Sequence, residues 1–112
     1  MPAISVIIPA FNEKKYIAAT LNALEKQTFT DYETIVVANG CTDGTEEILK
    51  ESKHHQRRHL SLPQANVSVA RNAGALNAQG NILVFLDADT QLAQNSLQKI
   101  AQEFTTDYSV AT

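Results

Sequence analysis

The sequence is short of several features, and each shortage narrows the class of protein. It has 1 cysteine, Cys41, which excludes an internal disulfide and fits a reducing compartment. The net charge of -3 leaves no basic surplus of the kind that a nucleic-acid surface carries. No apolar run reaches the roughly 20 residues of a membrane span, and residues 1–4 lack the layout of a signal peptide. We therefore expect a cytoplasmic location and no nucleic-acid partner; any membrane association would come from parts outside this chain.

The composition is that of one globular domain, with 112 residues, of which 44% are hydrophobic and 19% charged. Short apolar runs predict strands at residues 4–8, 32–38, 59–62 and 82–86, with another beginning within 108–112. Helical spacing predicts helices over residues 13–26, from Thr45, over residues 67–78, and from Asn95 or Ser96. Asn12 and Thr45 are the expected N-caps. Continuously apolar strands that alternate with helices predict a three-layer α/β/α fold with a mostly parallel sheet.

Three polar segments follow strands of this predicted sheet, at residues 9–13, 38–45 and 87–90. In an open parallel sheet, ligands bind at the carboxyl ends of the strands, where the strand order switches. We therefore expect these three segments to meet at one edge of the sheet and to form a ligand site there.

The third segment carries two aspartates, Asp87 and Asp89, after the most apolar run in the chain, residues 82–86. Like charges so close together disfavour each other's ionisation, and burial adds to the penalty. A hard divalent cation would neutralise them, and such cations often bridge carboxylates to phosphates. In an extended segment residues i and i+2 point the same way, so both side chains can face one ligand. The alternative is that they cap the next helix or lie solvated in a loop.

The other two segments offer further ligand contacts. Backbone N–H groups in residues 9–13, at the start of a helix, could bind a base or an anion, although an ordinary cap has the same pattern. Gly40 and Gly44 permit positive φ and the close approach of a ligand, or they form a plain turn. Arg71, beside Asn72 in an alanine-rich helix, is either solvated or placed to reach a phosphate or base edge.

Other chemistry is disfavoured by the same pattern. His54, His55 and His59 are more typical of a solvated basic segment than of a metal site, because adjacent helical residues project in different directions. Cys41 has no histidine or carboxylate evidently paired with it, as a nucleophile would need. No G-x-G-x-x-G follows the first strand, which disfavours a dinucleotide dehydrogenase.

Five segments follow one another in a specific order: Val6-Ile7-Ile8-Pro9-Ala10-Phe11-Asn12-Glu13, Val36-Val37-Ala38-Asn39-Gly40-Cys41-Thr42-Asp43-Gly44-Thr45, Ala70-Arg71-Asn72-Ala73-Gly74, Ala78-Gln79-Gly80 and Phe85-Leu86-Asp87-Ala88-Asp89. Together they resemble the nucleotide-binding half of a family 2 glycosyltransferase with the GT-A fold. The likeness spans nearly the whole chain. It implies that residues 1–112 form a nucleotide-diphospho-sugar-binding domain with a Rossmann-like sheet, within a longer catalytic domain.

The resemblance also implies a reaction and a set of residues. The reaction is transfer of a sugar from a nucleotide-diphosphate donor to an acceptor hydroxyl, usually with inversion and with Mn²⁺ or Mg²⁺. The acceptor, a saccharide, lipid or protein, stays open, as does pairing with a second copy of the chain. Substrate binding is implied for Pro9, Ala10, Phe11, Asn12, Glu13, Asn39, Gly40, Arg71, Asp87 and Ala88, and metal binding for Asp89 and Asp87.

Individual roles follow from the same resemblance. Pro9 and Ala10 would line the nucleobase pocket, with Glu13 at its edge. Asn39 would face the base, and Arg71 would lie near the base or the diphosphate. Asp87 would accept from the ribose or support the metal shell, and Asp89 would hold the metal ion against the diphosphate.

The chain departs from the family pattern in two respects. Family members often have acidic residues at the positions of Ala38 and Asn39, where an aspartate can accept a hydrogen bond from a uracil N–H. Asn39 can do so through its amide oxygen, whereas Ala38 cannot, and this leaves the donor base open. After Asp89 the only acids are Glu103 and Asp107, and nothing marks either as the general base. We therefore expect the base beyond Thr112, and weak binding of nucleotide and metal without sugar transfer by this chain alone.

Two alternatives use the same residues. Haloacid-dehalogenase-like phosphatases also carry two aspartates, one residue apart, after an apolar strand, often followed by threonine as in Asp87-Ala88-Asp89-Thr90. That motif normally opens the fold and is followed by a lysine and further acids, whereas here it comes after the fourth predicted strand. The second alternative is a non-catalytic nucleotide- or partner-binding domain, which the residues at positions 38 and 39 and the missing base would fit.

Overall fold

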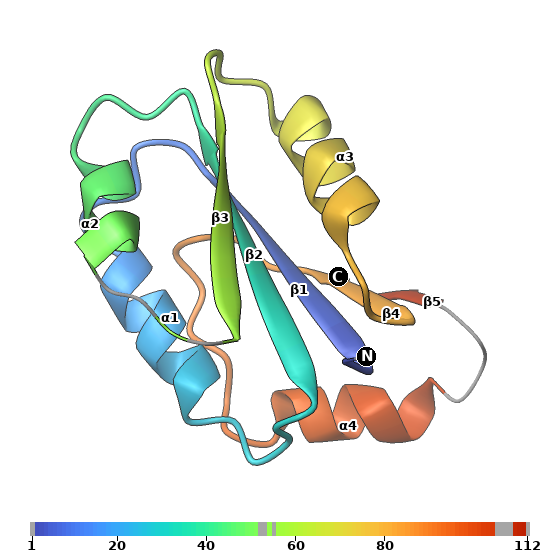
Figure 1. Cartoon of the computed structure of the whole chain (residues 1–112). Helices are drawn as coiled ribbons and strands as arrows, with labels where there is room; N and C mark the ends of the chain where they lie inside the picture. The colour runs from blue at the N-terminus through green and yellow to red at the C-terminus, as the bar shows by residue number, and fades with distance from the viewer. Residues whose placement is uncertain (1, 52–53, 55, 105–108, 112) are drawn as a thin grey trace.

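The computed structural model describes residues 2–51, 54, 56–104 and the backbone of residues 109–111. Strands and helices alternate along this part of the chain, as the sequence predicts (Figure 1). They are β1 (Ile4–Ala10), α1 (Ile17–Glu25), β2 (Tyr32–Asn39), α2 (Thr45–Glu51), β3 (Arg57–Leu62), α3 (Val67–Asn77), β4 (Ile82–Phe85), α4 (Ser96–Glu103) and β5 (Ser109–Ala111). None of the helices in these residues is long and apolar enough to cross a membrane.

The strands form one sheet in the order β3-β2-β1-β4-β5, and every neighbouring pair is parallel. The chain first moves outward from β1 through β2 to β3, and it then crosses back to β4 on the other side of β1. The strand order therefore reverses between β1 and β4, which is where ligands bind in open sheets of this type. The predicted parallel α/β fold is confirmed.

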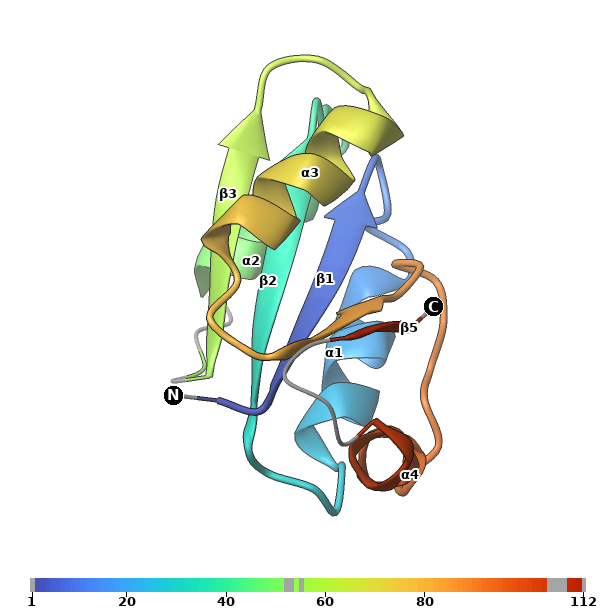
Figure 2. The ribbon, with the colours of Figure 1, turned by 90° about the vertical axis from the view of Figure 1, so that its right-hand side faces the viewer.

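Helices cover both faces of the sheet, with α3 on one face and α1 and α2 on the other (Figure 2). The larger core lies on the side of α1, α2 and α4, where Ile17, Leu49 and Leu97 pack on strand residues. The smaller core lies under α3, where Ala70 packs on Ile35 and Val37. This alternation of buried side chains to opposite faces is the expected behaviour of strands that are buried on both sides.

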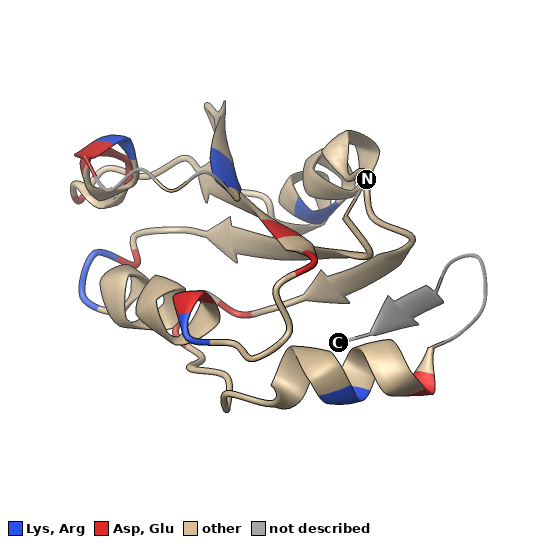
Figure 3. Ribbon diagram, turned by 60° about the horizontal axis from the view of Figure 1, so that its bottom comes forward, with Lys and Arg blue, Asp and Glu red and all other residues tan. Residues whose placement is uncertain are grey.

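The helix α3 lies very close to β1 because a glycine faces the strand. A Cβ atom at Gly74 would come within 2.4 Å of the Ile7 side chain. Glycine is therefore required here by close packing, and the close approach sets the height of α3 above the sheet. In the described part of the chain, Lys and Arg positions are scattered over several elements rather than gathered on one face (Figure 3).

The prediction that Asn12 caps the first helix was wrong. The helix α1 begins at Ile17 with Tyr16 as its N-cap, and the residues between Asn12 and Tyr16 form turns. Asn12 has φ of 52°, in the left-handed region that an N-cap does not adopt. Its side chain accepts from the Thr42 N–H at 2.7 Å, so it joins two loops instead of capping a helix.

Strand β3 begins earlier than the predicted residue 59, because the basic Arg57 and Arg58 are part of it. Their side chains are paired on opposite faces of the sheet, Arg57 with Glu25 at 3.6 Å and Arg58 with Glu33 at 2.6 Å. Each ion pair neutralises the charge of an arginine, which allows these two residues to be part of a strand. The last predicted strand is confirmed at residues 109–111, and its predicted start at Tyr108 lies outside the described residues.

Candidate functional site

The three polar segments do meet at the carboxyl edge of the sheet. In the sheet register Ala10 at the end of β1 pairs with Ala38, and Asn39 at the end of β2 pairs with Leu62. Leu86, one residue after β4, donates its N–H to the carbonyl of Ile7 in β1 at 2.9 Å. The loops after β1, β2 and β4 therefore leave the sheet side by side, at the switch point of its strand order.

A carboxylate and a hydroxyl fasten the loop after β1 to the loop after β2. Asp43 accepts from the Lys14 N–H at 3.1 Å and from the Thr45 N–H at 3.0 Å. The Thr45 hydroxyl donates to Asp43 at 2.5 Å and accepts from the Glu13 N–H at 3.0 Å. The Thr45 hydroxyl and the Lys14 N–H hold the pKa of Asp43 below its ordinary value. The expectation that N–H groups of residues 9–13 are open to a ligand is therefore wrong for Glu13.

The same hydrogen bonds correct the expected cap of α2. Thr45 is the first residue of that helix and is fully buried, rather than lying before it as an N-cap. Its backbone N–H is satisfied by Asp43, two residues earlier, so the aspartate takes the role that the sequence assigned to the threonine.

Both glycines of the second loop have positive φ, as predicted, with 68° at Gly40 and 99° at Gly44. A Cβ atom at Gly40 would lie 2.7 Å from the backbone nitrogen of Ala65, so the close approach that requires glycine here is made by the chain itself. Cys41 lies next to Gly40, half-buried, and its thiol donates to the carbonyl of Ala10 at 3.1 Å. The thiol thus joins the ends of β1 and β2.

The acidic pair lies in a turn rather than in an extended segment. Thr90 donates its N–H to the carbonyl of Asp87 at 3.0 Å, which closes the turn. Even so, Asp87 and Asp89 are both exposed while Ala88 between them is buried. The fully buried hydroxyl of Thr20 in α1 donates to the carbonyl of Ala88 at 2.5 Å. The turn is therefore held by α1 through Ala88, and the two aspartates on either side of Ala88 are exposed to solvent.

Aspartates from the loops after β2 and β4 act on Glu13 in the loop after β1. Burial raises the pKa of Glu13, and the negative charges of Asp89, Asp43 and Asp87 raise it further, in that order. The ion pairs of the described residues, Lys50–Glu46, Arg57–Glu25 and Arg58–Glu33, all lie elsewhere. Within the described ranges, no group of three or more His, Cys, Asp or Glu side chains is arranged to hold a metal ion by itself. Negative charge therefore gathers at this edge, and none of these ion pairs neutralises it.

Asn39, at the end of β2, is 4% exposed and connects the sheet to α3. Its side-chain oxygen accepts from the Asn66 N–H at 2.8 Å, and the side chain of Asn66 caps α3 by accepting from the Val69 N–H at 3.1 Å. Arg71 lies exposed on the second turn of α3, so the same helix carries the cap and the arginine. Pro9 is half-buried at this edge and Phe11 is 50% exposed.

Three contributors to this edge were missed by the sequence analysis. Thr20 is one polar residue within an apolar helical pattern, and nothing in the spacing marks its bond to Ala88. Asn66 could have been found as a cap, because an asparagine directly precedes the predicted helix from residue 67. The bond between Thr45 and Glu13 joins residues from separate loops, and only the fold brings them together.

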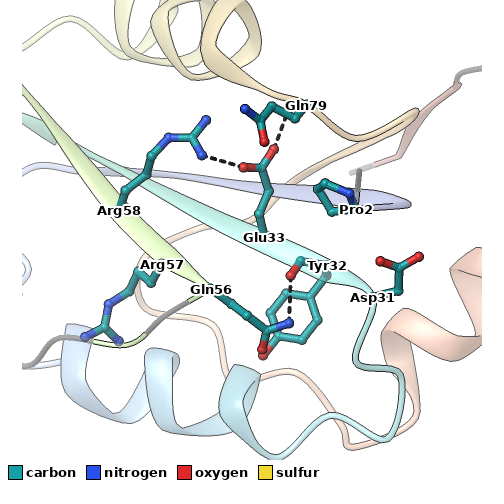
Figure 4. Close-up of a pocket in the computed structure, with 8 residues that line it drawn as sticks. All are labelled: Pro2, Asp31, Tyr32, Glu33, Gln56, Arg57, Arg58 and Gln79. Atoms are coloured by element: carbon teal, nitrogen blue, oxygen red, sulfur yellow. Dashed lines mark hydrogen bonds and ion pairs between the residues drawn. The ribbon is translucent and has the colours of Figure 1, made fainter.

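A second polar cluster lies at the opposite end of the sheet, around a cavity of about 390 Å³ (Figure 4). Glu33 is 6% exposed there and accepts from the Ser5 hydroxyl at 2.5 Å, from the Gln79 N–H at 2.6 Å and from Arg58 at 2.6 Å. Burial raises the pKa of Glu33, but these hydrogen bonds and the Arg58 charge outweigh burial, so the pKa lies below its ordinary value. The Ser5 hydroxyl also accepts from the Gly80 N–H.

The histidines line a separate cavity of about 630 Å³ between α2 and β3, where His54 and His59 lie with Lys50, Arg57 and Arg58. Its mixture of cations supports the interpretation of a basic segment over that of a metal site. His55 lies outside the described residues.

Comparison with known proteins agrees with the geometry. Residues 5–112 match the family described as Glycosyl transferase family 2. The chain is 36% identical to "Glycosyltransferase GlyA" of Streptococcus pneumoniae serotype 4, over 96% of this chain and 16% of that protein. It is 38% identical to "Glycosyltransferase AglE" of Haloferax volcanii, over 88% of this chain and 34% of that protein.

The fold matches solved structures of TarS from Staphylococcus aureus. For TarS 1-349 in complex with UDP the TM-score is 0.83 at 30% identity, covering 89% of this chain and 31% of that chain. For its complex with UDP-GlcNAc the TM-score is 0.82 at 30% identity, covering 89% and 30%. The chain thus spans well under half the length of these relatives. The match over residues 5–112 removes the phosphatase alternative, and the chain belongs to glycosyltransferase family 2.

Proposed function

We propose that this chain supplies the donor-binding half of a glycosyltransferase that moves a sugar from a nucleotide-diphosphate donor to an acceptor hydroxyl with inversion. The observation that carries the proposal is the convergence of Glu13, Asn39, Asp87 and Asp89 at the switch point of the sheet, in a member of family 2. The TarS structures in complex with UDP and UDP-GlcNAc, which share the fold of this chain, support the donor class.

The proposed base pocket lies between the end of β1 and the first turns of α3. Pro9, Ala10 and Phe11 would line it, with Asn12 and Glu13 at its rim and Gly40 directly after β2. Arg71, exposed on α3, would reach the base or the diphosphate, because a guanidinium is suited to planar and phosphate partners. The hydrogen bonds of Asp43 and Thr45 hold the rim in place before a donor arrives.

The acidic edge fits a divalent cation such as Mn²⁺ or Mg²⁺. Asp87 and Asp89 are exposed and unpaired by the ion pairs of the described residues, and their charge raises the pKa of Glu13. Mg²⁺ favours one or two carboxylates completed by phosphate oxygens, so the diphosphate would supply the remaining ligands. A bound cation would stabilise the charge that develops on the leaving nucleoside diphosphate. Thr20 would keep both carboxylates oriented through its bond to Ala88.

The attacking hydroxyl also needs a general base within hydrogen-bond reach. Glu103 is the last residue of α4, and this helix packs on the face of the sheet opposite α3. Asp107 lies outside the described residues. We propose that the base lies in sequence beyond residue 112, so that the isolated chain binds donor and does not turn it over.

The test is titration of the chain with UDP and GDP, with and without Mn²⁺, by calorimetry. We expect Mn²⁺-dependent binding that Asp89→Ala weakens at least about tenfold, a loss of about 1.4 kcal/mol. Asp31→Ala is the matched control, because Asp31 is exposed at the opposite end of the sheet. Absence of nucleotide binding at millimolar concentration would favour a partner-binding domain instead.

A further inference from the structure

We propose that Asn39 offers an N–H donor to the nucleobase, so that the site prefers a pyrimidine whose ring N3 is an acceptor, as in cytosine, over one that carries N3–H, as in uracil. This inference rests on the proposed function, since it concerns the base pocket of the same donor site. The inference depends on which atom of the Asn39 amide is left free to bind a ligand, and the hydrogen bond from Asn66 decides this.

The orientation of the Asn39 amide is set by the backbone of Asn66. The Asn66 N–H can only donate, and the atom of Asn39 that faces it at 2.8 Å is therefore the amide oxygen. A flipped amide would place its NH₂ group against that N–H, two donors facing each other. Because the position of the amide oxygen is identified in this way, the NH₂ group must be the other branch of the amide.

That NH₂ group has no hydrogen bond to another described residue, while every buried side-chain N or O atom in the described ranges has a partner. The Nδ2 atom therefore lies in the small accessible part of a residue that is only 4% exposed. The amide oxygen of Asn39 is therefore engaged within the protein, whereas its NH₂ group is accessible from outside and can donate to a ligand.

The surface where this donor emerges lies beside α3. Ile35 and Val37 face α3, and Asn39 follows them at the same two-residue spacing, so its side chain lies on the same face. In β1, Ile7 faces Gly74 of α3, which places Pro9 on that face as well. The donor therefore opens beside Pro9 and the capped start of α3, within the proposed base pocket.

The consequence is opposite to the expectation from sequence alone, in which the Asn39 oxygen accepts from a uracil N–H. The oxygen is engaged with Asn66, and the group left for the base donates. A donor suits the lone pair on cytosine N3 and opposes the N3–H of uracil. A polar site discriminates strongly when one partner's group is left unpaired.

The test compares CDP with UDP in the presence of Mn²⁺, on the wild-type chain and on Asn39→Asp. The carboxylate of Asn39→Asp keeps an acceptor for Asn66 and replaces the donor by a second acceptor. We expect the wild-type chain to bind CDP about tenfold more tightly than UDP, and Asn39→Asp to reverse that preference. Asn22→Asp, exposed on α1, controls for the added negative charge, and thermal unfolding checks that each variant is folded.

The outcomes separate the two proposals. Metal-dependent binding of both nucleotides with a CDP-to-UDP ratio that Asn39→Asp leaves unchanged overturns the role of Asn39 and leaves the donor site standing. A wild-type preference for UDP likewise overturns the role of Asn39. Failure of the wild-type chain to bind either nucleotide overturns the donor site, and the inference with it.

Discussion

Two glutamates at opposite ends of the sheet, Glu33 and Glu13, lie in opposite electrostatic environments. At the amino end, Glu33 is buried, is bonded to Ser5, Gln79 and Arg58, and has a lowered pKa. At the carboxyl end, Glu13 has a pKa raised by burial and by neighbouring acids. A carboxylate with matched donors stabilises the fold, whereas a group of carboxylates that no ion pair of the described residues neutralises is suited to bind a cation. Under the proposed function, the comparison separates a residue that stabilises the fold from residues that bind a ligand.

The largest expected effect on stability comes from removing the side chain of Glu33. We expect Glu33→Ala to lower the free energy of unfolding by about 3 kcal/mol, because Ser5 and Gln79 lose their acceptor and Arg58 its partner. Urea denaturation measures it. Asp87→Ala serves as the control from the other end and should change stability by no more than about 0.5 kcal/mol, because Asp87 is exposed. Equal losses in the two variants would abolish the distinction between the ends.

The next largest effect concerns the hydrogen bond from Thr20 that holds the turn of Asp87 and Asp89. Thr20→Val keeps the shape of the side chain but leaves the buried carbonyl of Ala88 without its donor. We expect a loss of about 1–2 kcal/mol in unfolding free energy and weaker Mn²⁺-dependent nucleotide binding. Thr28→Val, at an exposed position, is the control. Unchanged nucleotide affinity in Thr20→Val would show that the turn does not need this support.

The contributions of Glu33 and Glu13 to stability should also respond oppositely to pH. The folded-state pKa of Glu33 lies below the ordinary 4.5, so its contribution is present above that pH and is lost as pH falls through the folded pKa. The folded-state pKa of Glu13 lies above 4.5, so its contribution is present below that pH and is lost as pH rises through the folded pKa.

Urea midpoints measured between about pH 3 and pH 7 test this difference. Glu33→Gln should remove part of the loss of stability in acid, and Glu13→Gln should remove part of the loss on the neutral side. Parallel changes of the same sign in both variants would contradict the opposed pKa shifts.

The smallest expected effect is on a single titration. After burial, Asp89 is the largest cause of the raised pKa of Glu13. Asp89→Asn should therefore lower the pKa of Glu13, as followed by NMR of the side-chain carboxyl carbon. Asp31→Asn, at the other end of the sheet, should leave it unchanged. A Glu13 pKa that ignores Asp89→Asn would mean that the two loops do not share one electrostatic environment.

Local patterns were sufficient to predict most elements and the meeting of the strand-end loops. Apolar runs such as residues 4–8 place their strands, and the parallel rule then brings Asp87 and Asn39 to one edge. The start of α1 was mispredicted because asparagine is a common N-cap residue, whereas the side chain of Asn12 accepts from the N–H of Thr42 in another loop. The sequence also could not show which atoms of the Asn39 amide are free, because this depends on the N–H of Asn66, the N-cap of α3. Contacts distant in sequence, rather than propensities, decided both cases.

The central claim is that the carboxyl edge, and not the amino end, holds a metal ion with a nucleoside diphosphate. The most direct measurement is paramagnetic broadening of backbone amide NMR signals by substoichiometric Mn²⁺ with UDP or CDP present. The account predicts selective broadening at residues 87–89 and at Glu13, with Glu33 and Gln79 unaffected. Broadening centred on Glu33 and Gln79, or no selective broadening at residues 87–89, would contradict it.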